Sequence, residues 1–383
     1  MTFKDKFLEL VKKPKFILIL WILLATFAGV REYFGKGYNN YSIFKHVYYH
    51  TLNQQPLFES YPDSYWDVNH YGPFFSVVIA PFAALPDAVG IPLWVIAGAL
   101  ILFFAIKALP IDDTQRVVIY WLITSDLFTA FVNTQFNPII TATIILAYCF
   151  VRDEKDFWAA FFIMFGAFVK LYSIAGLAFF FFSKHKTKLL AYSVMWAVLF
   201  FAIPMIISSS EFIIDSYIDW WNILTVKDSL NAELTSYQDF SVMGIYRRIT
   251  HDPTVSSIYF LAPGIFFFFV PYLKISQYKN DFFQMLLLCS VLIFIVIFSS
   301  SSEGSTYIIA TTGAALWFVL HRPPSKLVIA LICAVMLASL SSMLLPSDIY
   351  KAWIIGYSLK ALPSFLVWCY VIYEMIALRV KQT

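Results

Sequence analysis

The chain has few charged residues. Of its 383 residues, only 13% are Asp, Glu, Lys or Arg, whereas 60% are hydrophobic. Soluble domains carry about 25% charged residues, so this composition excludes an ordinary soluble protein. The formal net charge of +3 is too small to favour nucleic acid as a partner.

Cysteine and the common catalytic motifs are scarce or absent. The four cysteines lie in apolar runs, as small buried hydrophobic residues do: Cys149, Cys289, Cys333 and Cys369. The chain has no Walker lysine loop, no GxGxxG, no HExxH and no CxxC. We therefore expect no disulfide framework, no metal and no cofactor. The first apolar run ends at Arg31 and Glu32 without a cleavage site, which favours a retained anchor.

Long apolar runs are abundant. A bilayer crossing needs about 20 apolar residues, and candidate spans lie at roughly 16–30, 89–107, 115–132, 136–151, 157–170, 172–183, 188–208, 256–273, 281–300, 305–320, 327–344 and 358–378. We expect an all-α integral membrane protein with about 12 transmembrane helices, in one membrane domain over residues 1–383. The apolar stretch 73–84 is short for a full crossing. Either it is re-entrant, or one pair of short predicted spans has been split at the wrong place.

Basic residues indicate the orientation, because cytoplasmic loops are rich in Lys and Arg. They cluster at the N-terminus, between spans and after the last span, for example Lys4, Lys6, Lys12, Lys13, Lys15, Arg152, Lys184, Arg379 and Lys381. Both termini are then cytoplasmic, and three polar segments lie outside: 31–72, 209–255 and 299–305. The first is a large extracytoplasmic loop, in which residues 41–53 have a helical pattern suited to the membrane interface.

One lysine lies inside an apolar stretch. Lys170 is near the middle of AAFFIMFGAFVKLYSIAGLAFFFF, where an ammonium costs about 2.5–3.5 kcal/mol on insertion scales. Such a charge persists where it has a partner, faces a wet cavity, or snorkels to the interface. Short or broken helices often line polar cavities, so Lys170 indicates a polar site at the outer end of its helix.

The outer segments supply further candidates. Arg248 and Lys170 together can hold a phosphate on the outer leaflet, although Arg247 and Arg248 equally suit contact with lipid headgroups. Possible bases or metal ligands in the first loop are Asp63, Asp67, His50 and His70; Glu303 is another acid, in a short serine-rich loop. All of these are also ordinary surface residues of polar loops. Asp126 lies within a predicted span, where hydrogen bonds to Thr124 or Ser125 would satisfy it.

Five segments, in order along most of the chain, resemble glycosyltransferase family 87, the polyprenyl-phosphate-mannose-dependent mannosyltransferases of the GT-C fold. They read NNYSIFKHVYYHTLNQQPLF, HYGPFFSVVIAPFAALP, TQFNPIITATIIL, FGAFVKLYS and FSVMGIYRRI. SSSSEGSTYIIA is similar to a later motif of a bacterial subgroup, with Ser300 and Ser301 in place of His and Lys.

This resemblance implies inverting transfer of a sugar, such as mannose, from a polyprenyl-phosphate donor to an extracytoplasmic glycan or glycolipid acceptor. The enzyme would be a multi-pass protein of the inner (cytoplasmic) membrane, with its active site facing outwards. The family's catalytic aspartate falls on Asn40, which cannot take a proton, so another acid must act as the base. We assign Asp67 as base, with Glu303 in reserve.

The remaining roles follow from the same resemblance. Lys170 and Arg248 would bind the phosphate, and polar residues on matching or neighbouring positions would contact the substrate: Asn40, His70, Gln135, Asn137 and Ser241. Two alternatives remain. A flippase or transporter of lipid-linked sugars also needs broken helices, but would show pseudo-symmetric halves. A catalytically inactive binder is favoured by Asn40.

Overall fold

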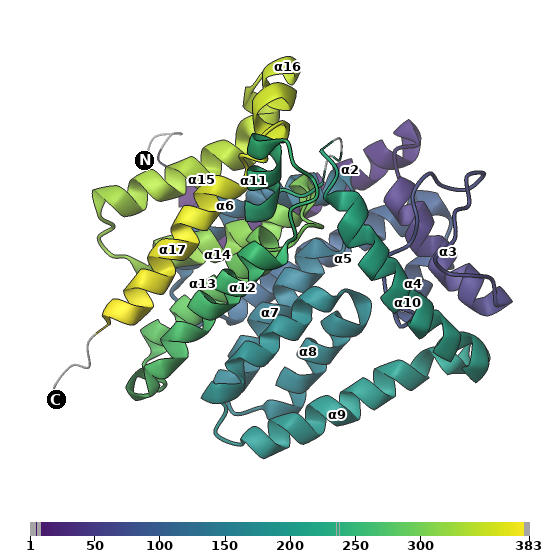
Figure 1. The fold of residues 1–383 in the computed structure, drawn as a ribbon, viewed down its shortest axis with the longest axis horizontal. Coiled ribbons are helices and arrows are strands. Elements are labelled where there is room, and N and C mark those ends of the chain that lie inside the picture. Colours follow the sequence, from purple (N-terminus) through teal and green to yellow (C-terminus); the bar gives the residue numbers. More distant parts are fainter. Residues whose placement is uncertain (1–4, 6–8, 235, 237, 379–383) are drawn as a thin grey trace. The chain divides into compact units, whose positions relative to one another are not determined.

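The computed structural model describes residue 5 and residues 9–234, 236 and 238–378 (Figure 1), and every element in this part of the chain is a helix. It divides into two compact units. Unit 1 contains the described residues up to Ile111 together with Leu127–Val226, and unit 2 contains Asp112–Asp126 and the described residues from Lys227 onward. Four basic residues used for the predicted orientation lie outside the described residues: Lys4, Lys6, Arg379 and Lys381.

Unit 1 is organised around α7 (Asn137–Arg152), nearly all of whose side chains are buried. The helices α5, α8 and η1 pack against it, α9 packs on α8, and α2 packs on α5. Pro14 opens α2, where its missing N–H is not needed. The other helices of unit 1 are α2 (Pro14–Gly35), α3 (Asn39–Asn53), α4 (Phe75–Ala83), α5 (Asp87–Ala108), α8 (Asp156–Val169), η1 (Leu171–Phe182), α9 (Lys186–Ala202) and η2 (Ile203–Ile206). Most of α10 (Ser210–Asn231) also belongs to unit 1, but its residues from Lys227 on belong to unit 2.

Unit 2 has α14 (Tyr307–Leu320) at its centre, with most of its side chains buried. The helices α13, α15 and α17 pack against it. Polar caps begin two of these helices: Asn280 accepts from Phe282 N–H in α13, and Ser325 accepts from Val328 N–H in α15. The remaining elements are α11 (Val242–Thr250), α12 (Ile258–Phe269), η3 (Val270–Leu273), η4 (Ile275–Gln277), α13 (Asp281–Ile297), η5 (Gly304–Thr306), α15 (Lys326–Leu344), α16 (Ser347–Ile349), η6 (Tyr350–Ile355) and α17 (Ala361–Ala377). α6 (Asp113–Val132) contributes residues to both units.

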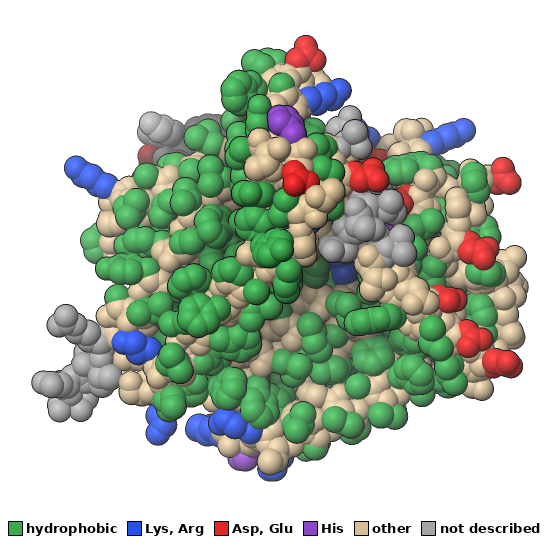
Figure 2. Space-filling model, viewed as in Figure 1, with side chains coloured by type: hydrophobic (Ala, Val, Ile, Leu, Met, Phe, Trp, Pro, Cys, Tyr) green, Lys and Arg blue, Asp and Glu red, His purple; other side chains and the backbone are tan. Residues whose placement is uncertain are grey.

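Large apolar side chains also cover the outer faces of several helices, as a hydrocarbon surrounding requires. Figure 2 shows hydrophobic side chains over the region of α9 and α12. In α9, Val194 and Val198 are exposed, and in α12 so are Phe266 and Phe267. Within the described part of the chain, four helical segments are long and apolar enough to cross a membrane: Pro14–Gly35, Asp87–Ala108, Lys186–Ile206 and Lys326–Leu344.

The predicted helices agree well with the structure. Each apolar run predicted as a span contains a helix, and the predicted helix at 41–53 is α3. The short stretch 73–84 contains only the nine-residue α4. Among the residues that the structure describes, seven further apolar helices are shorter than 18 residues. The number of crossings, the orientation and the single domain therefore stay predictions. The sequence analysis missed α10 and α11, which lie in a segment expected to be a polar outer loop.

Candidate functional site

Lys170 lies at a break between two helices, not in the middle of one. The α-helix α8 ends at Val169, Lys170 is extended (φ −148°, ψ 118°), and the 3-10 helix η1 begins at Leu171. The two helices run antiparallel, because a Cβ on Gly176 would meet Ile163 and one on Gly166 would meet Ser173. Lys170 is therefore at the tip of a helical hairpin, which confirms the broken helix expected there.

The ammonium of Lys170 is held by polar and aromatic groups. Its Nζ donates to Asn137 Oδ1 at 3.0 Å. The same Nζ lies 4.9 Å from the ring centroid of Tyr172 and 5.8 Å from that of Tyr71. The residue as a whole is half-buried. Aromatic faces attract a cation without neutralising its charge, which leaves the ammonium able to bind an anion.

Asn137 begins α7 beside a sharp turn. Thr134 has a positive φ of 49°, and its carbonyl accepts a hydrogen bond of 2.8 Å from Trp94 Nε1. Tyr71 donates through its hydroxyl to Gln135 Oε1 at 3.3 Å. The turn therefore brings Gln135 and Asn137 into one polar cluster with Tyr71 and Lys170, which we call the Lys170 cluster.

The chain around His70 is fixed against this cluster. Trp220 of α10 donates to the His70 carbonyl at 2.9 Å, and Gly72 N–H donates to the Val169 carbonyl at 3.1 Å. A Cβ at Gly72 would clash with the Phe168 carbonyl, so only glycine allows so close an approach to the hairpin tip.

Asn40 and Asp67 lie in the neighbouring segment 31–72. Asn40 Nδ2 donates to the Asn133 carbonyl at 2.9 Å, at the end of α6. Asp67 is half-buried, and its Oδ1 accepts from Val68 N–H at 2.8 Å. In α3, burial, with a smaller contribution from nearby His46, lowers the pKa of His50 to about 4, so its imidazole is neutral near pH 7.

Arg248 has a different setting from the predicted phosphate site. Its guanidinium donates to the carbonyls of Ser236, Gln238 and Asp239 at 2.6, 3.0 and 3.1 Å, and to the hydroxyl of Ser358. Burial lowers the pKa of Arg248. Since these bonds occupy both terminal nitrogens, the structure gives Arg248 the task of holding the segment before α11.

Ser241 and Arg247 hold the same segment. Ser241 is fully buried, caps α11 by accepting from Gly244 N–H at 3.0 Å, and donates to Asp239. Arg247 forms an ion pair of 2.9 Å with Asp239 Oδ2. Burial raises the pKa of Asp239, although Ser241 and Arg247 oppose this shift. The pattern S-x-x-G followed by two arginines therefore encodes a capped helix and a buried ion pair.

Glu303 also has a local structural task. It begins η5 with a capping box, in which Glu303 N–H donates to Thr306 Oγ1 at 3.3 Å. Ser305 donates to Glu303 Oε1 at 3.0 Å. Glu303, Ser241 and Arg248 belong to unit 2, whereas the Lys170 cluster belongs to unit 1. Among the described residues, no group of three or more His, Cys, Asp or Glu side chains is arranged to hold a metal ion.

The all-helical fold, the apolar outer faces and the polar cluster at a broken helix define a membrane protein with a cationic site in one of its units. The family model for glycosyltransferase family 87 matches residues 69–300, which is more than half of the chain. The protein therefore belongs to glycosyltransferase family 87, and the family indicates a glycosyltransferase. Comparison with curated proteins found no match.

The matched region includes the Lys170 cluster and both Ser241 and Arg248, but not the proposed acids. Asn40 and Asp67 precede it, and Glu303 follows it. Three residues of the sites were missed by the sequence analysis: Tyr71, Tyr172 and Asp239. The tyrosines stand next to predicted residues, but aromatic residues are so frequent in this chain, at 19%, that position alone did not mark them.

Proposed function

We propose that this protein transfers a hexose, such as mannose, from a polyprenyl-phosphate donor to an extracytoplasmic glycan or glycolipid, with inversion at the anomeric carbon. The single observation that carries the proposal is the ammonium of the half-buried Lys170 at the tip of the α8–η1 hairpin, 3.0 Å from Asn137 Oδ1. A phosphate leaving group needs such a cation, and the family supplies the reaction type.

In the proposed reaction, a hydroxyl oxygen of the acceptor attacks the anomeric carbon of the donor. The bond between that carbon and the phosphate oxygen breaks, and the polyprenyl phosphate leaves with the electron pair. The hydroxyl proton passes to Asp67, with Glu303 as the reserve base. Lys170 binds the leaving phosphate, and Gln135, Asn137, Asn40 and His70 contribute hydrogen bonds to the donor.

The proposed roles differ in the loss of rate expected when each residue is removed. Removal of a general base typically costs about 10²–10⁴-fold in rate, and removal of a group that stabilises developing charge costs about 10²–10³-fold. Arg248 already donates to four chain acceptors, so we assign the phosphate contact to Lys170. Arg248 and Ser241 then contribute indirectly, by fixing the segment before α11.

The test is transfer of labelled sugar from a synthetic polyprenyl-phosphate hexose in reconstituted membranes. We expect Lys170→Ala to lower the rate about 10²–10³-fold, while Lys107→Ala, at an exposed lysine of the same unit, leaves it unchanged. Asp67→Asn is expected to lower the rate about 10²–10⁴-fold, with Glu59→Gln in the same outer segment as its control. Wild-type rates in Lys170→Ala would refute the phosphate role, and wild-type rates in Asp67→Asn would transfer the role of base to Glu303.

One observation favours a second candidate, a protein that binds lipid-linked sugars without transferring them. Asn40 stands where the family has its catalytic aspartate, and its side chain donates to the Asn133 carbonyl. Such a protein would retain the donor in copurified lipid, and Asn40→Asp would create transfer activity. Transfer by the wild-type chain excludes this candidate.

A further inference from the structure

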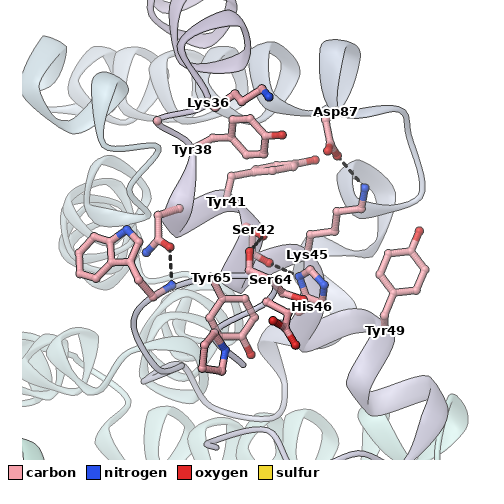
Figure 3. A pocket seen from close by; sticks show the side chains of 15 residues that line it. Lys36, Tyr38, Tyr41, Ser42, Lys45, His46, Tyr49, Ser64, Tyr65 and Asp87 are labelled. Carbon is pink, nitrogen blue, oxygen red and sulfur yellow. Dashed lines mark hydrogen bonds and ion pairs between the residues drawn. The ribbon is translucent and has the colours of Figure 1, made fainter. Parts of the chain in front are cut away.

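A second polar site lies in unit 1, in a cavity of about 690 Å³ on the outer segment (Figure 3). One face of α3 forms its floor, residues 62–66 form one wall, and Asp87 at the start of α5 closes the other side. Small-molecule sites have volumes of about 300–1,000 Å³, so the cavity is of suitable size. None of the residues assigned above to the proposed reaction lines it.

The cavity is a built structure rather than a gap between loops. Ser42 Oγ donates to the Ser64 carbonyl at 3.1 Å, and Trp66 N–H donates to Asn39 Oδ1 at 3.0 Å. These two bonds fasten the wall to α3. Tyr41 is fully buried and donates to the Phe82 carbonyl at 2.9 Å, which ties the floor to α4.

Charge in the cavity is balanced. Lys45 Nζ forms an ion pair with Asp87 Oδ1 at 2.6 Å, and their side chains are 24% and 28% exposed. The other Lys and Asp residues of the lining are Lys36 and Asp63, so two cations and two anions line the cavity. A balanced site gives no net attraction to a phosphate or to a cation, which favours a neutral ligand.

Aromatic faces and mixed hydrogen-bonding groups complete the lining. Trp66 lines the cavity and is 80% exposed. Figure 3 shows the rings of Tyr38, which directly precedes α3, and of the buried Tyr41 extending towards the side of Asp87. His46 Nδ1 lies 2.7 Å from the Ser42 carbonyl. Because a carbonyl only accepts, Nδ1 carries the proton, and in the neutral ring Nε2 is an acceptor.

We propose that this cavity binds a neutral saccharide. A sugar presents apolar C–H faces to aromatic rings and hydroxyl groups that both donate and accept, and the cavity offers rings, an ion pair with both kinds of partner, and an imidazole. Identifying this saccharide as part of the acceptor glycan rests on the proposed function, whereas its binding does not.

The helix α3 separates this cavity from the Lys170 cluster. Asn39, Ser42 and His46 are spaced by three or four residues and share the cavity face. On the other side of α3, the Phe44 ring packs at 4.8 Å from Tyr71, which belongs to the Lys170 cluster. A phosphate-bearing donor would thus bind at the cationic Lys170 cluster, and a neutral sugar would bind in the cavity, whose charges balance. Both sites lie in unit 1.

The test measures binding to the full-length protein in lipid nanodiscs, because maltoside detergents carry a saccharide themselves. The probes are mannobiose and mannose 6-phosphate, detected by saturation-transfer NMR from the protein to the sugar protons. We expect mannobiose to bind more tightly than mannose 6-phosphate. Trp66→Ala should weaken mannobiose about fivefold to tenfold, whereas Trp353→Ala, at an exposed tryptophan in unit 2, should not change it.

A sharper test changes the net charge of the cavity and measures whether its preference between the two sugars changes. Asp87→Asn leaves Lys45 without its carboxylate, so the cavity becomes positive and mannose 6-phosphate should gain affinity relative to mannobiose. Lys45→Met should shift the ratio the other way. Equal or tighter binding of mannose 6-phosphate by the wild type, or no effect of Trp66→Ala on mannobiose, would overturn the proposal.

The same measurements separate this proposal from the transfer reaction. Lys170→Ala should retain mannobiose binding while it loses transfer. Mannobiose binding without transfer by the wild type would contradict the proposed function and leave the saccharide site standing. Transfer without mannobiose binding would contradict the saccharide site alone.

Discussion

Replacing Lys360 by methionine is expected to destabilise unit 2 by about 3–5 kcal/mol, because it leaves a buried carboxylate without its cation. Lys360 Nζ lies 3.0 Å from Asp126 Oδ1, and the two side chains are 5% and 0% exposed. The other carboxylate oxygen accepts from Thr311 at 2.6 Å and from Ser339 at 2.5 Å. The ammonium also donates to the Gly304 carbonyl at 3.2 Å, so it ties the start of η5 to α6.

The magnitude depends on what each replacement leaves behind. In Lys360→Met the two hydroxyls still donate to Asp126, but they do not neutralise its charge. In Asp126→Asn the ammonium stays buried without a negative partner, beside the Gly304 carbonyl and the Tyr307 ring, whose centroid lies 4.9 Å away. The double variant Asp126→Asn/Lys360→Met buries no charge at all. Replacing a whole buried pair by neutral groups is often nearly neutral in stability, so we expect the double variant to be more stable than either single one.

The assay is thermal unfolding of the four proteins in the same nanodiscs, followed by tryptophan fluorescence. Lys351→Met, at an exposed lysine in η6, is the matched control and should change stability by less than about 0.5 kcal/mol. A coupling of several kcal/mol between the two single changes supports the ion pair. Losses in the double variant that equal the sum of the single losses would refute the reasoning, since independent sites add.

Two further predictions concern unit 2. Gly244→Ala should lower stability by about 1–3 kcal/mol, because the new methyl would clash with the Asp239 carbonyl and lie 3.0 Å from Ser358 Oγ. Gly35→Ala, with open space around it, is the control in the same melting assay. Equal melting temperatures of Gly244→Ala and Gly35→Ala would contradict this prediction. Burial lowers the pKa of His321, but its hydrogen bond to Glu374 at 2.6 Å, its hydrogen bond to the Trp317 carbonyl and the negative charge of Glu374 together outweigh burial and raise the pKa overall. The stabilisation by His321 is therefore complete below about pH 6.5 and is lost as pH rises through the raised pKa. The melting difference between wild type and His321→Gln should therefore shrink from pH 6 to about pH 9, and a constant difference would exclude this linkage.

Most of the helices could be predicted from the sequence, because each apolar run is long and bounded by charged or polar residues. The helix α10 was missed for a physical reason. Its apolar positions are interrupted by Asp215 and Asp219, so the segment does not form an apolar run, and its contacts with the chain, such as Trp220 to the His70 carbonyl, depend on tertiary structure. The start of α11 was predictable, since a serine before a helix is the usual N-cap, but Ser241 was interpreted through the resemblance instead.

Partners distant in sequence could not be derived. Asp126 was expected to be satisfied by Thr124 or Ser125, yet Lys360, 234 residues away, is its ion-pair partner. Likewise, Arg248 was interpreted as an anion-binding residue. Three of its acceptors belong to the loop before α11, whose path no periodicity encodes, and the fourth, Ser358, is 110 residues away in the sequence. A single sequence gives the positions of buried charges, whereas their partners depend on how helices pack.

The same reasoning explains why Lys170 stood out in the sequence more clearly than either proposed base, Asp67 or Glu303. A lysine within an apolar run is improbable without a role, because its burial costs about 2.5–3.5 kcal/mol, and the structure provides Lys170 with Asn137 and two aromatic rings. An acid in a polar loop costs nothing, so Asp67 and Glu303 look alike in sequence. The capping box at Glu303 uses that carboxylate to begin a helix, whereas Asp67 is half-buried beside the exposed Trp66. This difference is the structural reason to test Asp67 as the base before Glu303.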